Sequence, residues 1–282
     1  METMLMRGKP VADVYRETIT EKIVAAKQRG LLVTLAIVVV GDDPASHVYK
    51  GRLVKLIEGL GGAAKVIELP GDASEEDVIG VVKKLNRNRY VTGILPMMPM
   101  PKHINGDAVG AAVSPNKDVD CLNPQNSGDV FMGRSKWAAC TPRACMAILE
   151  HYGIELDGKN VVVIGRSNVV GKPLGMMLLG KNATVTVCHT ATRNLAAHTL
   201  NADIIIASAG KPEMITADMV TERSILIDVG INTVNGRLCG DASAEACQKA
   251  AAYTPVPGGV GALTTAVLLM HTVRAAMKAQ KE

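Results

Sequence analysis

The stretch Lys159–Gly175, KNVVVIGRSNVVGKPLG, decides the fold of the C-terminal half of this chain. Its apolar, β-branched run Val161–Ile164 predicts a buried strand. Gly165 ends that strand, and Gly171 and Pro173 open a helix. A strand followed by a Gly-bounded turn and a helix N-terminus forms a cradle for an anion. Backbone N–H groups and the helix dipole there point toward whatever phosphate binds.

The same alternation continues beyond this stretch. Three further apolar runs, separated by helical or polar segments, predict strands at Ala183–Cys188, Asn201–Ala207 and Ser224–Val229. A series of this kind predicts a Rossmann-like, doubly wound parallel sheet that binds a dinucleotide. The glycine spacing, Gly165-x5-Gly171, departs from the common G-x-G-x-x-G, and Arg166 occupies the turn.

The N-terminal half also alternates between strands and helices, so the predicted fold class is α/β with two α/β domains. Strands are predicted at Leu31–Val40, Ala64–Leu69 and Val91–Leu95. Helices are predicted at Ala12–Arg29, which Gly30 ends, at Ser46–Gly59, from a Ser74 cap to about Asn88, and at Asn105–Val113. The polar segment Ser114–Trp137 is predicted to be an irregular connector at the domain boundary. A helix capped by Thr141-Pro142 and running to Tyr152 follows, and Thr264–Lys278 is the final helix.

Composition restricts the class of protein. A chain of 282 residues can form two hydrophobic cores, and its net charge of +4 is scattered without a Lys/Arg block, so no nucleic-acid partner is expected. The ten-residue apolar run Leu31–Val40 is too short to span a membrane, and no signal-peptide pattern begins the chain. Six cysteines lack a C-x-x-C pair or a Cys/His cluster. We therefore expect reduced thiols, no bound metal, no membrane partner and a cytoplasmic location.

Six ordered segments carry a family resemblance. They are GDDPAS-x-V-Y, GIL-x-x-x-P-x-P, P-x-K-D-V-D, C-T-P, V-V-V-I-G-R-S-N-x-V-G-K-P and P-V-P-G-G-V-G, and they run from Gly41 to Gly261. In order and spacing they resemble the methylenetetrahydrofolate dehydrogenase/methenyltetrahydrofolate cyclohydrolase family, the FolD proteins. The resemblance covers nearly the whole chain.

This resemblance implies a folate-binding catalytic domain at residues 1–137, joined by the C-terminal helix at 263–282, and an NAD(P)-binding domain at 138–262. It also implies an active-site cleft between these two domains. It implies an oxidoreductase of one-carbon metabolism that transfers a hydride from 5,10-methylenetetrahydrofolate to NADP. The family's second activity, as a cyclohydrolase, adds water to the methenyl product to give 10-formyltetrahydrofolate. The implied partners are tetrahydrofolate derivatives and a second copy of the chain in a homodimer. A non-catalytic folate- or nucleotide-binding paralogue is the alternative.

The resemblance also implies the residues of the substrate site. Tyr49 matches a tyrosine that stacks on the folate ring, although by itself it also fits a tyrosine packed in the core. Asp120 matches an aspartate that accepts N–H groups of the pterin, although it also fits a turn. These two are the predicted catalytic residues, whereas Asp118 is expected to be structural. The loop residues that allow close approach to ligands, or form a plain turn, are Pro257, Gly258 and Gly259.

Two departures from the family pattern concern catalysis. Four residues after its tyrosine the family carries a catalytic lysine, which a glutamine holds, and here these positions are Leu53 and Met97. Loss of both partners leaves neither one buried and unsatisfied. Lys50, Arg52 and Lys55 point elsewhere around the helix. We therefore expect the dehydrogenase to survive better than the cyclohydrolase, because adding water requires a positioned proton carrier.

The cofactor side is predicted from the end of the second strand of the C-terminal half. Residues 188–193, CHTATR, lack the Asp or Glu that binds the ribose hydroxyls of NAD. Arg166 and Arg193 could instead meet a 2′-phosphate, although Arg193 also fits a solvated helix start. Thr190 could donate a hydrogen bond there, so we expect NADP rather than NAD. The predicted cofactor-binding residues are Gly165, Arg166, Ser167, Val170, Gly171, Pro173, Thr190 and Ile231.

Overall fold

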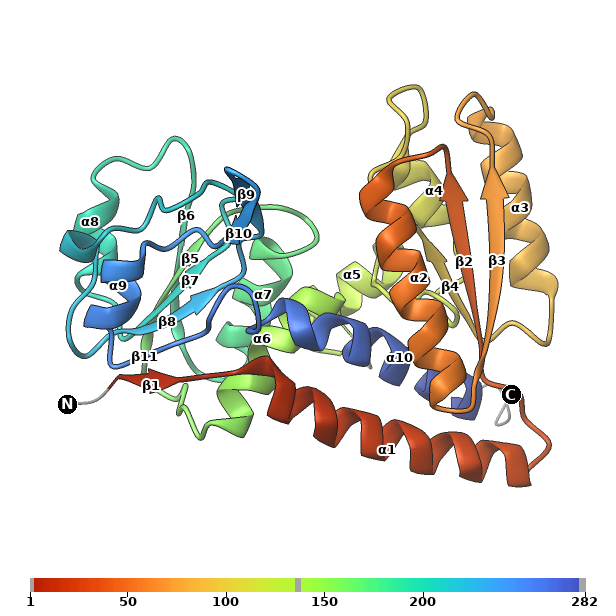
Figure 1. Cartoon of the computed structure of the whole chain (residues 1–282), viewed down its shortest axis with the longest axis horizontal. Helices are drawn as coiled ribbons and strands as arrows, with labels where there is room; N and C mark the ends of the chain where they lie inside the picture. The colour runs from red at the N-terminus through yellow and green to blue at the C-terminus, as the bar shows by residue number, and fades with distance from the viewer. Residues whose placement is uncertain (1–2, 135–137, 279–282) are drawn as a thin grey trace. The chain divides into compact units, whose positions relative to one another are not determined.

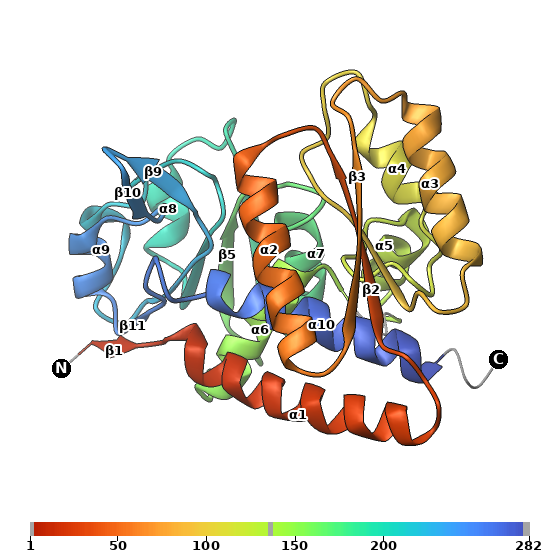
Figure 2. The same ribbon diagram turned by 45° about the vertical axis from the view of Figure 1, so that its right-hand side comes forward.

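The computed structural model describes residues 3–134 and 138–278. Its internal contacts divide the chain into two compact units, and each unit is built from two segments of the chain. Met1–Asp13 and Val130–Thr264 form what we call the six-stranded unit. Val14–Asp129 and Thr265–Glu282 form the three-stranded unit. Figures 1 and 2 show the elements of both.

The six-stranded unit contains an all-parallel sheet with the strand order β1-β11-β8-β7-β5-β6. Its strands are β1 (Met4–Leu5), β5 (Asn160–Ile164), β6 (Thr184–Cys188), β7 (Ile204–Ala207), β8 (Ile225–Asp228) and β11 (Ala252–Tyr253). Since β6 lies on one side of β5 and β7 on the other, the order reverses at β5. The sheet is therefore doubly wound, as the sequence predicts. The central strands are almost entirely buried, which explains their unbroken apolar runs.

Short helices and one hairpin complete this unit (Figure 1). The helices are α6 (Cys140–His151), α7 (Gly171–Leu179), α8 (Leu195–Thr199), the 3-10 helix η1 (Ala217–Met219) and α9 (Ala244–Lys249). The antiparallel hairpin consists of β9 (Asn232–Val234) and β10 (Arg237–Cys239). Asn235 and Gly236 both have positive φ at its tip, which suits a two-residue hairpin turn.

The three-stranded unit contains a parallel sheet with the order β3-β2-β4. Its strands are β2 (Thr34–Val40), β3 (Ala63–Leu69) and β4 (Gly93–Pro96). Its helices are α1 (Gly8–Gln28), α2 (Pro44–Gly59), α3 (Glu75–Arg87), α4 (Gly106–Ala112), α5 (Pro124–Phe131) and α10 (Gly261–Lys278). Helices α1, α5 and α10 each have residues in both units.

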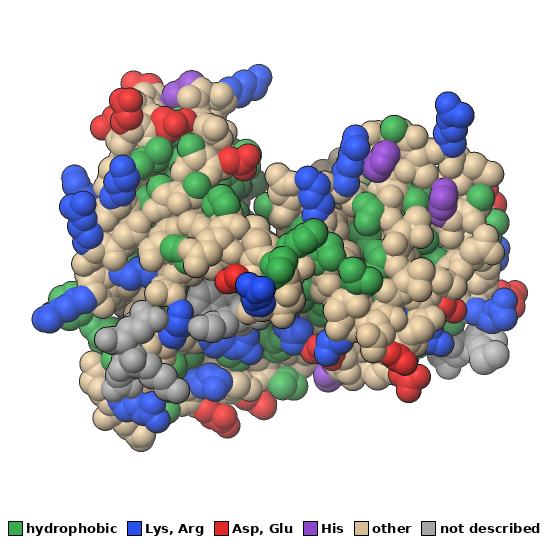
Figure 3. Space-filling view, turned by 180° about the vertical axis from the view of Figure 1, so that it is seen from behind, with side chains coloured by type: hydrophobic (Ala, Val, Ile, Leu, Met, Phe, Trp, Pro, Cys, Tyr) green, Lys and Arg blue, Asp and Glu red, His purple; other side chains and the backbone are tan. Residues whose placement is uncertain are grey.

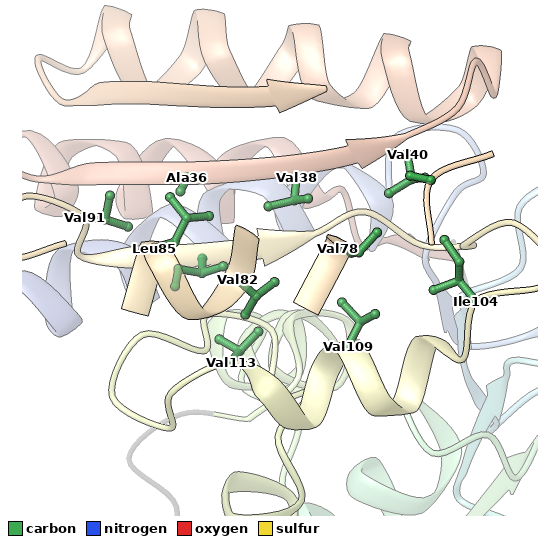
Figure 4. Packing of buried hydrophobic residues seen from close by; sticks show 12 residues of the cluster. Ala36, Val38, Val40, Val78, Val82, Leu85, Val91, Ile104, Val109 and Val113 are labelled. Carbon is green, nitrogen blue, oxygen red and sulfur yellow. The ribbon is translucent and has the colours of Figure 1, made fainter. Parts of the chain in front are cut away.

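One apolar cluster holds α3 and α4 against this sheet. Figure 4 shows side chains of β2 on one side of the cluster and side chains of the two helices on the other. The labelled members are Ala36, Val38, Val40, Val78, Val82, Leu85, Val91, Ile104, Val109 and Val113. Each fully buried Val or Leu contributes about 1.5–3 kcal/mol relative to an exposed one. This cluster therefore fixes the frame from which the loops of the unit project.

Several local predictions are confirmed, and two are wrong. Ser74 caps α3 in a capping box with Asp77, and Gly30 has a φ of +71° at the end of α1. The predicted irregular connector Ser114–Trp137 instead contains α5, and its residues 135–137 lie outside the described residues. Thr141 does not cap α6. That helix begins at Cys140 behind Ala139, which makes no side-chain cap, and Pro142 is accepted in the first turn, where its missing N–H breaks no helical bond.

The first residues of the chain belong to the six-stranded unit, whereas the sequence placed residues 1–137 in one domain. The N–H of Met4 donates to the carbonyl of Ala251 at 2.9 Å, and the N–H of Met6 donates to that of Tyr253 at 2.8 Å. Met6 is also completely buried. A two-residue strand leaves almost no pattern in a sequence, because alternation needs at least four residues to be visible.

Charged side chains are dispersed over the surface that Figure 3 shows. Lys and Arg side chains lie singly or in small groups, with Asp and Glu side chains among them, and no extended basic patch covers this face. Within residues 3–134 and 138–278, no helix is both long and apolar enough to cross a membrane.

Candidate active site

A tight turn between β5 and α7 brings backbone segments into close contact. Gly165 has a φ of +132°, and a Cβ on it would lie 2.4 Å from the carbonyl oxygen of Ser208. A Cβ on Gly171 would lie 2.1 Å from the carbonyl oxygen of Gly165. Only glycine permits either approach. Helix α7 therefore begins directly against the turn, where its N–H groups and dipole favour a phosphate, and this arrangement fits the pyrophosphate of a dinucleotide.

The other predicted residues of this turn lie at or near the surface. Arg166 and Ser167 are exposed, and Val170 and Pro173 are half-buried. The hydroxyl of Ser167 accepts the N–H of Val170 at 3.1 Å, which closes the turn before the helix. Pro173 is the third residue of α7, where a missing N–H costs no helical bond. Arg166 therefore follows Gly165 in the turn and is open to solvent.

A compact turn also follows β6. The N–H of His189 donates to the hydroxyl of Thr192 at 2.8 Å, and the ring Nδ1 of His189 accepts the N–H of Ala191 at 3.2 Å. His189 thus shapes the turn. Thr190 and Arg193 are both exposed. No carboxylate occurs between residues 188 and 193 to repel a 2′-phosphate.

The loop at residues 255–259 packs closely against itself and against Gly8. The Val256–Pro257 peptide bond is cis, and Gly258 has a φ of +107°. A Cβ on Gly259 would lie 2.6 Å from the carbonyl oxygen of Pro255, and a Cβ on Gly8 would lie 2.0 Å from that of Gly259. Gly8 and Gly259 are therefore required by contacts between backbone segments, and Gly258 by its positive φ, whether or not a ligand binds.

Helix α2 carries the predicted tyrosine and the leucine that replaces the family's lysine. Asp43 caps its N-terminus by accepting the N–H of Ser46 at 2.8 Å. Tyr49 is half-buried, and Leu53, one turn later on the same face, is fully buried. Met97 follows β4 and is 6% exposed. Both positions that the family uses for a polar pair are thus apolar and closed to water.

The neighbouring lysine on α2 is held away from that position. Lys50 forms an ion pair with Glu68 of β3, and its Nζ lies 2.9 Å from the Nδ1 of His47. Lys50 accordingly holds the pKa of Glu68 below its usual value. Arg52 and Lys55 are exposed. The structure therefore places none of these three cations at position 53.

Asp118 is the structural carboxylate that the sequence predicts. It is 1% exposed, and it accepts the N–H of Leu122 at 3.0 Å, the N–H of Asn123 at 2.9 Å and the Nδ2–H of Asn126 at 2.8 Å. Burial raises the pKa of Asp118, and these hydrogen bonds oppose the rise. Its carboxylate thus organises the loop that follows Asp120.

Asp120 lies at the end of a segment that is fixed to the unit at two points. The N–H of Ile94 donates to the carbonyl of Lys117 at 2.7 Å. The Nδ1–H of His271, on α10, donates to the carbonyl of Val119 at 2.9 Å, since a carbonyl can only accept. Asp120 itself is half-buried. The backbone therefore presents it from a rigid edge.

Sequence reasoning missed two buried aspartates in the six-stranded unit. Asp228, at the end of β8, is 3% exposed, and Asp241, after the hairpin, is fully buried. Burial raises the pKa of Asp228 to about 6, and the nearby carboxylate of Asp241 adds to the rise. The signal in the sequence was an acidic residue at the end of an apolar strand, SILID. In the described part of the chain, no group of three or more His, Cys, Asp or Glu side chains could hold a metal ion.

The predicted residues fall into two groups, one on each unit. The six-stranded unit holds Gly165, Arg166, Ser167, Val170, Gly171, Pro173, Thr190, Ile231, Pro257, Gly258 and Gly259. The three-stranded unit holds Tyr49 and Asp120, together with the departures Leu53 and Met97.

Two family models match the chain. Residues 6–120 match the catalytic domain of tetrahydrofolate dehydrogenase/cyclohydrolase, and residues 139–280 match the NAD(P)-binding domain of the same family. Together they cover most of the chain, and they confirm the resemblance that the motifs predict.

Full-length relatives agree with these models. A bifunctional FolD protein from Moorella thermoacetica is 45% identical over 280 residues, which are 99% of this chain and 100% of that protein. The crystal structure of FolD methylenetetrahydrofolate dehydrogenase/cyclohydrolase from Campylobacter jejuni has a TM-score of 0.96 and 38% identity, covering 98% of this chain and 99% of that one. A Trypanosoma brucei FolD structure, complexed with NADP cofactor and inhibitor, has a TM-score of 0.93 and 31% identity, and the match covers 100% of both chains. By full-length similarity in sequence and fold, this chain belongs to the tetrahydrofolate dehydrogenase/cyclohydrolase (FolD) family.

Proposed function

We propose that this chain works mainly as an NADP-dependent methylenetetrahydrofolate dehydrogenase and has lost most of the cyclohydrolase activity of its family. As a family member it is an enzyme of folate one-carbon metabolism, and NADP is its cofactor. The observation that carries the proposal is the pair Leu53 and Met97. Both side chains are apolar, with exposures of 0% and 6%. No ammonium group stands at the position where the family carries one.

The dehydrogenase and cyclohydrolase reactions make different demands on positions 53 and 97. NADP supplies the hydride acceptor, and the protein has to align the donor carbon with it. Tyr49 and Asp120, which we propose stack on the folate ring and bind the pterin edge, are both retained in this chain, so alignment of the substrate should survive. Adding water to the methenyl group needs a group that moves a proton beside the one-carbon bridge. A positioned acid or base contributes roughly 10²–10⁴-fold to such a step.

Two separate assays test the proposal, one of NADPH formation and one of the decay of methenyltetrahydrofolate. We expect the unmodified enzyme to oxidise methylenetetrahydrofolate and to hydrolyse the methenyl compound at least about 100-fold more slowly. The single change Leu53→Lys should rescue hydrolysis poorly, because an ammonium at this fully buried position has no polar partner while residue 97 is methionine, and it loses its proton. The double change with Met97→Gln should rescue more than the two singles combined, as coupled neighbours do.

The matched control is Val48→Lys. It adds a lysine to the same helix at an exposed position, about 140° around the axis from Leu53, and should leave hydrolysis unchanged. If the unmodified enzyme hydrolyses the methenyl compound as fast as it oxidises the methylene compound, the proposal is wrong.

Arg166 is proposed as the determinant of the preference for NADP over NAD. Arg166 is an exposed residue of the turn between β5 and α7, and an Arg–phosphate contact contributes about 1.5–3 kcal/mol. Arg166→Ala should therefore raise the KM for NADP roughly 10- to 150-fold and leave the KM for NAD nearly constant. Arg237→Ala removes another exposed arginine of the same unit and should change neither value. An unchanged NADP/NAD ratio in Arg166→Ala would refute this role.

A homodimer and a cytoplasmic location complete the proposal. The edge strand β3 leaves Val66 39% exposed, and an unpaired edge of this kind can pair with a second copy. None of the six cysteines forms a disulfide, which suits a reducing compartment. Sedimentation analysis of the purified chain tests the dimer, and Val66→Lys should weaken it.

A further inference from the structure

Asp241 is fully buried, and its carboxylate accepts several backbone hydrogen bonds. Its carboxylate accepts the N–H groups of Ala209 at 2.6 Å, Gly210 at 2.9 Å and Lys211 at 3.0 Å. It also accepts the Nδ2–H of Asn232 at 2.9 Å. The three N–H groups belong to the loop after β7, and Asn232 begins the hairpin after β8. One carboxylate thus ties two loops together.

Asp228 fixes the backbone at Asp241 through hydrogen bonds. The carboxylate of Asp228 accepts the N–H of Gly230 at 2.9 Å, that of Asp241 at 3.0 Å and that of Ala242 at 2.9 Å. A Cβ on Gly240 would lie 1.9 Å from Oδ2 of Asp228, and one on Gly230 would lie 2.2 Å from Oδ1 of Asp241. The two carboxylates and the two glycines therefore form one packed cluster.

This cluster fixes the residues on both sides of Ile231. Gly230 is bonded to Asp228 and packs on Asp241, and Asn232 is bonded to Asp241. Ile231 is nevertheless 68% exposed. Two buried carboxylates therefore fix a segment whose apolar side chain lies in solvent. Burying such charges is costly unless they are fully hydrogen-bonded, and here they are. A requirement for a fixed position explains this arrangement.

The place of these loops in the sheet says which part of a dinucleotide they face. In doubly wound sheets the ligand lies across the carboxyl ends of the strands, at the point where the strand order reverses. Here the reversal is at β5, with β6 on one side and β7 and β8 on the other. The ribose with the 2′-phosphate belongs at the end of β6, so the nicotinamide half faces the loops that follow β7 and β8.

We propose that Asp241 is the positioning residue for the nicotinamide half of NADP: it locks the loop Ala209–Lys211 and the segment Gly230–Asn232 in one conformation, so that Ile231 is presented to the nicotinamide ring. This inference rests on the proposed use of NADP. A preformed surface lowers the cost of ordering on binding, and hydride transfer depends on the orientation of the ring. Asp241 acts through the loops and makes no contact with the cofactor itself.

The test compares two ligands in binding assays on the full chain, namely NADP and adenosine 2′,5′-bisphosphate, which lacks the nicotinamide half. Asp241→Ala should weaken NADP binding at least tenfold and change the binding of the bisphosphate by less than twofold. Asp241→Asn, which keeps one acceptor oxygen, should recover part of the NADP affinity. Asn232→Ala removes one hydrogen bond and should give a smaller loss in the same direction, which keeps the test available if Asp241→Ala does not fold.

The matched control is Asp203→Asn. Asp203 also accepts a backbone N–H, that of Asn160 at 2.8 Å, but it lies at the amino end of β7, so NADP binding should not change. If folded Asp241 or Asn232 variants bind NADP and transfer hydride as the wild type does, the inference is overturned. Equal weakening of both ligands overturns it as well, since the effect would then be general. If the wild type binds neither ligand, the proposed use of NADP fails instead.

Discussion

At the residue scale, Asp228 brings a titratable group into the interior of the six-stranded unit. Burial raises its pKa from 3.8 to about 6, while its hydrogen bonds with backbone N–H groups oppose the rise. The folded protein therefore holds this proton more tightly than the unfolded chain does. The resulting contribution to stability is complete below about pH 4 and is lost as the pH rises through about 6.

Asp228→Asn should remove this pH dependence. Between about pH 5 and pH 7 we expect the free energy of unfolding of the wild type to fall by roughly 1 kcal/mol more than that of the variant. Urea unfolding at the two pH values measures the difference. Asp203→Asn, which changes an exposed carboxylate, should follow the wild type. Parallel pH dependences of Asp228→Asn and the wild type would show that Asp228 does not titrate in this range.

Single residues differ in how far the sequence predicts them. Gly165 and Gly171 were predicted because a strand, a turn and a helix start are local features, and the structure shows the close backbone contacts that require them. Asp241 was not predicted. Its partners, from Ala209 to Asn232, come together only when β7 and β8 pair, and no local pattern records that pairing.

At the element scale, α3 is stabilised at both ends by side chains. Ser74 and Asp77 form the capping box at its start. At its other end, the Nζ of Lys117 donates to the carbonyls of Leu85 at 3.3 Å, Asn86 at 2.8 Å and Asn88 at 2.8 Å. A cation at the carboxyl end also interacts favourably with the helix dipole. Lys117 thus links α3 to the segment that ends in Asp120.

Lys117→Met should destabilise the protein by about 1–3 kcal/mol, because the apolar stem stays while the hydrogen bonds to the three carbonyls are lost. The same change at Lys83, an exposed residue of α3, is the control and should cost less than about 0.5 kcal/mol. Denaturant unfolding measures both. Equal effects of the two substitutions would mean that Lys117 does not stabilise the end of α3.

Elements were predicted well where the pattern was periodic and poorly where polar residues act at a distance. The strand Val161–Ile164 and the helix after Ser74 follow from local periodicity and capping. Helix α5 was missed because its sequence, PQNSGDVF, is typical of a loop. Its Asn126 is in fact committed to the buried Asp118, and this tertiary bond overrides the low helix propensity.

At the scale of the whole molecule, both units are discontinuous in sequence. The six-stranded unit takes residues from the beginning of the chain, and the three-stranded unit takes the C-terminal part of α10. Strand β1 joins its sheet through parallel pairing with β11, and the hydroxyl of Thr3 adds a bond to the carbonyl of Gln248 at 2.9 Å. The first residues are therefore part of the fold of the six-stranded unit.

Met6→Ala tests this attachment. Met6 is completely buried, so the change should cost about 2–5 kcal/mol of unfolding free energy. Met4→Ala, two residues away in the same segment, alters a side chain that is 40% exposed and should cost less than about 1 kcal/mol. Unfolding in urea compares them. A small loss for Met6→Ala would mean that the first residues contribute little to the sheet.

The pairing of β1 with β11 has a consequence for synthesis in the cell. A ribosome makes Met4–Leu5 long before it makes their partners, Ala252–Tyr253. Met4–Leu5 therefore leave the exit tunnel long before they have a strand to pair with, and each unit waits for its second segment before it can be completed. A nascent chain of this protein must stay soluble with its first residues unburied, and a chain that stalls before Ala252 leaves them open to chaperones and proteases.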